Sequence, residues 1–161
     1  MSNLISKQEV MRLLYPYFTS NDKMVLLAGD MGFAVLDSYF EHKNRAFNTG
    51  INEQATVGIA AGMSLTGLSP IIYSQVPFIT MRAFEQLRYD VNEHNLNIKI
   101  IGVGADNYFA PLGRSHCMDS DDVALIGILK NFLILSPTKE TIEEDIIKMM
   151  AYNGPVYMRS L

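Results

Sequence analysis

Residues 47–74 read FNTGINEQATVGIAAGMSLTGLSPIIYS, and this stretch decides the fold. Its middle part, Asn52 to Thr66, is rich in alanine and predicts a helix. Gly58 and Gly62 are four residues apart and share one helix face, which lets that helix approach another backbone closely. Ser69 to Ser74 follows as a short apolar run that predicts a buried strand. The stretch therefore predicts a helix that leads into a strand.

The same alternation continues in both directions along the chain. Further strands are predicted at 24–28, 45–48, 98–104, 132–135 and 155–158, and further helices at 6–19, 33–41, 80–94, 120–129 and after Pro137. Strands that are apolar on both faces and separated by helices indicate a parallel sheet covered on both sides. We predict an α/β fold: a three-layer α/β/α domain over residues 1–161, with helices on both faces of a mostly parallel sheet of about six strands.

Composition narrows the class of protein. Hydrophobic residues make up 48% of the 161 residues and charged residues 19%, which is typical of a globular domain. A net charge of −4 argues against nucleic acid as a partner. The single cysteine, Cys117, rules out an intrachain disulfide and fits a cytoplasmic protein. Lys7, Glu9 and Arg12 interrupt any signal-peptide pattern, and no stretch is long enough to span a membrane.

The place of a ligand site follows from the sheet. Ligands of parallel sheets bind beyond the carboxyl ends of the strands, so the loops after strands are the candidates. The longest, residues 105–118, contains Gly, Pro, Asp and Asn, and long loops are often functional. Another carries Glu53 into the first turn of the alanine-rich helix. Taken alone, Glu53 is a carboxylate that stabilises a helix N-terminus.

Three motifs that follow one another along the chain indicate a protein family. Residues 47–74, FITMRAFEQLRYDV at 78–91 and GRSHCMDSDDVAL at 113–125 resemble the pyrimidine-binding domain of the transketolase family. That family also includes deoxyxylulose-phosphate synthases and the beta subunits of 2-oxoacid dehydrogenases. The resemblance runs from about Met24 to Arg159, and the order and spacing of the motifs match.

The resemblance implies a chemical role for Glu53. In this family the matching carboxylate hydrogen-bonds a ring nitrogen of the aminopyrimidine of thiamine diphosphate, and so favours the imino form of that ring. The exocyclic nitrogen can then take the proton from the thiazolium carbon. The cofactor supplies the carbanion chemistry, and the protein places a carboxyl group within hydrogen-bond reach. Glu53 is therefore the expected catalytic residue.

The resemblance also implies the cofactor contacts. Phe78 falls on the second aromatic of the family's Phe-x-x-Phe element and would stack on the aminopyrimidine ring, although a core phenylalanine is the commoner fate. Asp30 and Met31 match an Asp-Leu pair near the cofactor, but Asp30 also fits a turn or helix cap. Arg82 begins the segment that resembles Arg-Ala-Tyr-Asp-Gln and is expected near the cofactor.

Two residues are expected at the substrate. His116 matches the histidine of the family's Thr-His-Gln segment, which implies substrate contact or catalytic proton transfer; otherwise it is a solvated loop residue. Arg159 follows the last strand, where the family carries an arginine that binds a substrate phosphate or carboxylate. An exposed terminal arginine is the alternative for Arg159.

Departures from the family pattern concern the substrate. Gln75 replaces the first aromatic of the Phe-x-x-Phe element, and Cys117 stands where the family has Gln. Leu112 occupies the region in which transketolases carry an aspartate that reads a donor hydroxyl. Because no carboxylate stands at this position, we expect the substrate to be a deoxy sugar, a 2-oxoacid or a sugar of different stereochemistry.

The family's diphosphate motif, Gly-Asp-Gly followed at a distance by Asn, does not occur in the chain. The resemblance thus implies a partner subunit that holds the diphosphate and Mg²⁺, with no metal ligand here, in a heterotetramer or larger assembly with homodimeric contacts. The expected activity is transfer of a two-carbon ketol unit between sugars. A 2-oxoacid decarboxylase, dehydrogenase or synthase subunit and a non-catalytic binding or regulatory domain are the alternatives.

Overall fold

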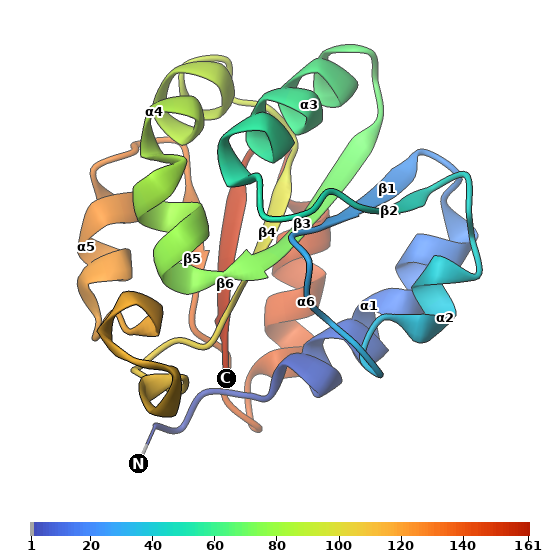
Figure 1. Ribbon diagram of the computed structural model, residues 1–161. Coiled ribbons are helices and arrows are strands. Elements are labelled where there is room, and N and C mark those ends of the chain that lie inside the picture. The colour runs from blue at the N-terminus through green and yellow to red at the C-terminus, as the bar shows by residue number, and fades with distance from the viewer. Residues whose placement is uncertain (1) are drawn as a thin grey trace.

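A six-stranded parallel sheet forms the centre of the molecule (Figure 1). The computed structural model describes residues 2–161. The strand order is β2-β1-β3-β4-β6-β5, and every neighbouring pair is parallel. The strands are β1 (Met24–Ala28), β2 (Ala46–Asn48), β3 (Ser69–Gln75), β4 (Lys99–Val103), β5 (Leu133–Leu135) and β6 (Val156–Ser160). The predicted α/β class and strand number are confirmed.

Helices cover both faces of this sheet (Figure 1). One face carries α1 (Lys7–Ser20), α2 (Asp37–Phe40) and α6 (Ile142–Ala151), and the other carries α3 (Glu53–Leu65), α4 (Phe84–Gln86) and α5 (Asp121–Gly127). Strand side chains alternate between the two layers: Leu26 packs with the first group, whereas Val25 and Leu27 pack with the second. Burial on both faces explains why β1 is apolar at all five positions.

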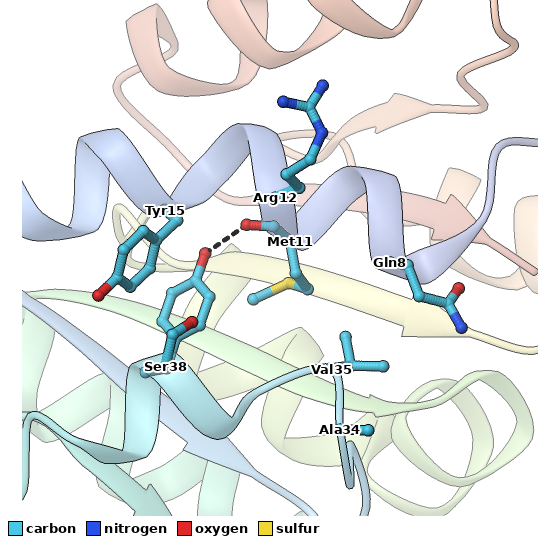
Figure 2. Close-up of a pocket in the computed structure, with 8 residues that line it drawn as sticks. Gln8, Met11, Arg12, Tyr15, Ala34, Val35 and Ser38 are labelled. Carbon is cyan, nitrogen blue, oxygen red and sulfur yellow. Dashed lines mark hydrogen bonds between the residues drawn. The ribbon is translucent and has the colours of Figure 1, made fainter.

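Helix α2 packs against α1, as Figure 2 shows. The buried Tyr39 hydroxyl on α2 donates a hydrogen bond of 2.7 Å to the Met11 carbonyl on α1. The expected helix at 33–41 is shorter and begins only at Asp37. The left-handed backbone of Gly32 and Ala34, with φ of 96° and 63°, prevents an earlier start.

The expected single helix at 80–94 differs most from the structure. It begins earlier and consists of a π-helical turn, Phe78–Arg82, then the short α4, then a second π-helical turn, Leu87–Asn92. Wide turns of this kind are frequent at functional sites. Hydrophobic periodicity alone does not reveal such a change of helical register, because the apolar positions still fall on one side.

The long loop after β4 contains two 3₁₀ turns, Ala110–Leu112 and Arg114–His116. Residues near both chain ends contact the start of this loop: the Ser2 hydroxyl donates to Asp106, and the Ala105 backbone N–H donates to the Ser160 carbonyl. Lys7 stacks its ammonium group 4.5 Å from the centre of the Tyr108 ring, and Leu161 donates a backbone hydrogen bond to Ile5. Across residues 2–161, no helix has the length and apolar character needed to cross a membrane.

Candidate active site

A cavity of about 290 Å³ opens at the carboxyl ends of the strands. Four loops line it, namely those that follow β1, β2, β3 and β4. Its walls are formed by Gly29, Asp30, Met31, Ile51, Glu53, Gln75, Phe78, Phe109, Leu112 and His116. The cavity lies where a parallel sheet is expected to bind its ligand. It brings together five of the seven site residues predicted from the sequence, and Arg82 contacts two of these five.

Glu53 is the first residue of α3, and it is only 3% exposed. Its Oε2 accepts a hydrogen bond of 2.8 Å from Nη1 of Arg82, whose side chain is 44% exposed. Oε1 has no hydrogen-bond partner among residues 2–161. The positive end of α3 and the guanidinium together compensate a negative charge that is removed from water. One carboxylate oxygen is thus held by the protein, and the other is free for a ligand.

Phe78 lies between Arg82 and His116. The guanidinium carbon of Arg82 is 4.3 Å from the centre of the Phe78 ring, and the His116 ring centre is 5.2 Å away at an angle of 69°. Nδ1 of His116 is 3.0 Å from the Ser115 hydroxyl oxygen. These contacts join the helical segment after β3 to the loop after β4, so Phe78 and His116, 38 residues apart in sequence, lie together in the cavity wall.

Asp30 is held by Asn48, a residue that the sequence reasoning missed. The Asp30 backbone has φ of 51°, and its carboxylate accepts a hydrogen bond of 3.1 Å from the Asn48 amide. Oδ1 of Asn48 accepts hydrogen bonds from the backbone N–H groups of Asp30, at 3.2 Å, and Gly50, at 2.9 Å. An asparagine in a glycine-containing loop is the sequence feature that suggests hydrogen bonds between its side chain and the loop backbone. The pairing fixes the two loops that carry Met31 and Glu53.

Arg159 does not line the cavity. Its Nε is 2.7 Å from Oδ2 of Asp122, and one terminal nitrogen is 2.6 Å from Oδ1 of Asp106. Only 7% of its side chain is exposed, so the expected alternative of an exposed terminal arginine is wrong. Desolvation lowers the pKa of Arg159, but the hydrogen bonds and charges of the two aspartates outweigh it and raise the pKa overall. Substrate binding by Arg159 stays a prediction.

The three residues that depart from the family pattern differ in exposure and in whether they line the cavity. Gln75, at the end of β3, is 8% exposed and lines the cavity. Leu112 lines the rim and is 61% exposed. Cys117 lies outside the lining residues, with its sulfur 3.5 Å from the Gly113 carbonyl oxygen. Phe109 and Ile51 are lining residues that sequence reasoning missed, and nothing in their local sequence marks them.

The part of the chain that the structure describes contains no group of three or more histidine, cysteine or acidic side chains arranged to hold a metal ion. The expectation that Mg²⁺ is held by a partner chain stays a prediction.

Comparisons with known proteins agree on one family. The model described as "Transketolase, pyrimidine binding domain" matches residues 10–160. The chain is 35% identical over 120 residues to one of the subunits of the apulose-4-phosphate transketolase of Actinobacillus succinogenes, and the match covers 74% of this chain and 38% of that protein. It is 27% identical to the 6-deoxy-6-sulfo-D-fructose transketolase subunit SqwH of Clostridium sp., over 92% of this chain and 47% of that one. The chain thus spans less than half the length of these curated relatives.

A solved structure resembles the chain over nearly its whole length. It is described as a split gene transketolase, inactive beta4 tetramer. The two share 31% identity and superpose with a TM-score of 0.79, over 96% of this chain and 51% of that one.

Proposed function

Because the chain belongs to the family of transketolase pyrimidine-binding domains, we propose that it is the pyrimidine-binding subunit of a split, thiamine-diphosphate-dependent transketolase-like enzyme. The observation that carries this proposal is the state of Glu53. It is a buried carboxylate at a helix start, with one oxygen held by Arg82 and the other free, in a cavity that also contains Phe78. A positioned carboxyl group of this kind suits proton sharing with a bound ring.

The lining residues fit an aminopyrimidine. Such a ring has two flat faces and several hydrogen-bonding nitrogens at its edge. Phe78 offers an aromatic side chain for stacking, Glu53 offers a carboxylate oxygen, and Met31 offers an apolar contact. When bound, thiamine diphosphate supplies a carbon nucleophile that adds to a carbonyl group, which is chemistry that no side chain provides.

The residues of this chain orient the cofactor and handle protons. Arg82 holds Glu53 in place and also stacks on Phe78, so one guanidinium fixes both cofactor contacts. His116 packs its ring against Phe78 and has one nitrogen, Nε2, without a partner among residues 2–161. That imidazole is suited to hydrogen-bond the substrate carbonyl or a hydroxyl group.

A second subunit completes the enzyme in this proposal. Both curated relatives are named as transketolase subunits, and the solved relative is a split-gene transketolase described as an inactive beta4 tetramer. These names support a partner that holds the diphosphate and Mg²⁺, in a heterotetramer or a larger assembly. The sugars named for the relatives, apulose 4-phosphate and 6-deoxy-6-sulfofructose, support an unusual ketose as the donor.

Reconstitution tests the proposal. The chain is mixed with a diphosphate-binding partner subunit, thiamine diphosphate and Mg²⁺, and transfer from ketose donors to aldehyde acceptors is followed. The donor loses a two-carbon unit by cleavage of its C2–C3 bond, and the acceptor gains that unit through a new C–C bond. Glu53→Gln should lower turnover by about 10²–10⁴-fold, since it removes a proton-sharing carboxyl group.

The matched control is Glu9→Gln. Glu9 lies on α1, pairs with the exposed Arg12 and is not one of the cavity lining residues. This variant should keep full turnover. Full turnover in Glu53→Gln would refute the role of Glu53, and the absence of ketol transfer with every donor would refute the transketolase assignment.

The second candidate function is 2-oxoacid decarboxylation or acyl transfer. The apolar Leu112 at the cavity rim favours it, because no carboxylate stands there to read a ketose hydroxyl. Consumption of pyruvate-like acids without any ketose activity would decide for it. A non-catalytic domain has less support, because Glu53, Phe78 and His116 share one cavity.

A further inference from the structure

Gln75 has a side-chain amide that faces the cavity and has no hydrogen-bond partner among residues 2–161. It is the last residue of β3, which lies between β1 and β4 in the sheet. Its side chain lines the cavity although the residue is only 8% exposed. The side-chain hydrogen bonds of the neighbouring Thr80 go to the Val76 carbonyl and the Met118 sulfur, so they leave the Gln75 amide free. Neither amide atom is a fully buried atom without a partner, so the amide of this nearly buried residue opens into the cavity, where a ligand can bind it.

The other polar side chains of the wall are engaged by the protein. Asp30 pairs with Asn48, Glu53 pairs with Arg82, and Nδ1 of His116 lies within hydrogen-bond distance of a serine hydroxyl. Among the described lining residues, Gln75 is the polar side chain with no protein partner at all. Its donor and acceptor are therefore both available to a ligand.

We propose that Gln75 determines specificity by hydrogen-bonding the hydroxyl group next to the carbonyl of a ketol donor; this rests on the proposed function. A primary amide both donates and accepts, which matches a neutral hydroxyl group. Gln75 shares a cavity of about 290 Å³ with Glu53 and Phe78. The part of the substrate that enters so small a space is the part that reacts, namely the carbonyl and the carbon beside it.

Within the described part of the chain, the apolar rim offers no other side chain that could take this role. The Leu112 side chain cannot form a hydrogen bond, although it lies at the cavity rim where a carboxylate could bind a hydroxyl group of the substrate. Recognition of a neutral hydroxyl group therefore depends on Gln75 in the cavity wall. A site with a buried hydrogen-bonding group rejects substrates that leave this group unpaired, so Gln75 favours hydroxylated over deoxy donors.

Two small acids that differ by one hydroxyl group test the inference. Hydroxypyruvate and pyruvate are supplied to the reconstituted two-subunit enzyme with glycolaldehyde as acceptor. In both cases the C1–C2 bond breaks, carbon dioxide leaves, one proton is taken up, and the remaining two-carbon unit bonds to the acceptor aldehyde. Release of carbon dioxide gives kcat and KM for each acid.

Gln75→Leu keeps the approximate size of the side chain and removes the amide. The ratio of kcat/KM for hydroxypyruvate to that for pyruvate should fall about 3- to 10-fold, as expected for one lost neutral hydrogen bond. The dissociation constant of thiamine diphosphate, measured by calorimetric titration at fixed Mg²⁺, should not change. Gln8→Leu is the matched control, because Gln8 lies on α1 beside a separate hollow (Figure 2). It should leave both measurements unchanged.

The outcomes separate the two proposals. If the wild-type enzyme consumes the acids but Gln75→Leu keeps the wild-type ratio, the specificity inference is wrong and the proposed function stands. A weaker affinity for thiamine diphosphate with an unchanged ratio also overturns it, because Gln75 then contacts the cofactor. If the wild-type enzyme consumes neither acid and no ketose, the proposed function itself fails, and this inference fails with it.

Discussion

Replacing Arg159 by Met tests whether this arginine supports the fold or contacts the substrate. The guanidinium donates two hydrogen bonds to Asp122 at 2.7 and 3.1 Å, and one to Asp106 at 2.6 Å. Asp122 is completely buried. Without the guanidinium, its only remaining side-chain partner among the described residues is the Tyr157 hydroxyl, 2.7 Å away.

Removal of one member of a buried ion pair costs about 3–5 kcal/mol, because the other charge is left uncompensated. For a chain of this size, 1 kcal/mol corresponds to a shift of about 2–4 °C in Tm, so Arg159→Met should lower Tm by about 6–20 °C. Circular dichroism follows thermal and urea unfolding directly, which suits a chain without tryptophan.

Two further variants sharpen the assay. Arg12→Met removes an exposed arginine, 65% accessible, from its pair with Glu9 and should change stability by less than about 1 kcal/mol. Combining Arg159→Met with Asp122→Leu should recover part of the loss, because no buried charge is left unpaired. If Arg159→Met is as stable as Arg12→Met and instead raises KM for the donor, the structural account is refuted and substrate contact is supported.

Three other side chains give predictions about stability. Tyr157→Phe should lower the free energy of unfolding by about 1.5–3 kcal/mol in urea titrations, because its hydroxyl donates to a buried carboxylate. Tyr73→Phe, the matched control, should leave it unchanged or raise it, because the Tyr73 hydroxyl is buried without a partner; equal losses in the two variants would contradict this. Burial lowers the pKa of Lys99 from 10.5 to about 8, so the folded state binds fewer protons than the unfolded state between these values. The stability difference between wild type and Lys99→Met should therefore grow in favour of wild type as pH rises from about 8 to 10.5, and a flat difference would refute the shift.

Most of the fold was predictable because its signals are local. The strand Met24–Ala28 is apolar at every position, and the structure buries all five residues between two helical layers. The broken helix after β3 was not predictable in detail. Its π-helical turns at Phe78–Arg82 and Leu87–Asn92 keep the apolar side chains on one side, so their periodicity resembles that of a regular helix.

For the site, the sequence by itself determined which residues are candidates. The order and spacing of the three motifs indicated Glu53, Phe78 and His116, and a parallel sheet necessarily gathers its strand-end loops at one edge. Only the tertiary structure decided which side chains that are far apart in the sequence form pairs. It joined Arg159 to an aspartate 37 residues earlier and left the Gln75 amide without a partner. Such pairings depend on which side chains converge after the chain folds, and no local pattern records that convergence.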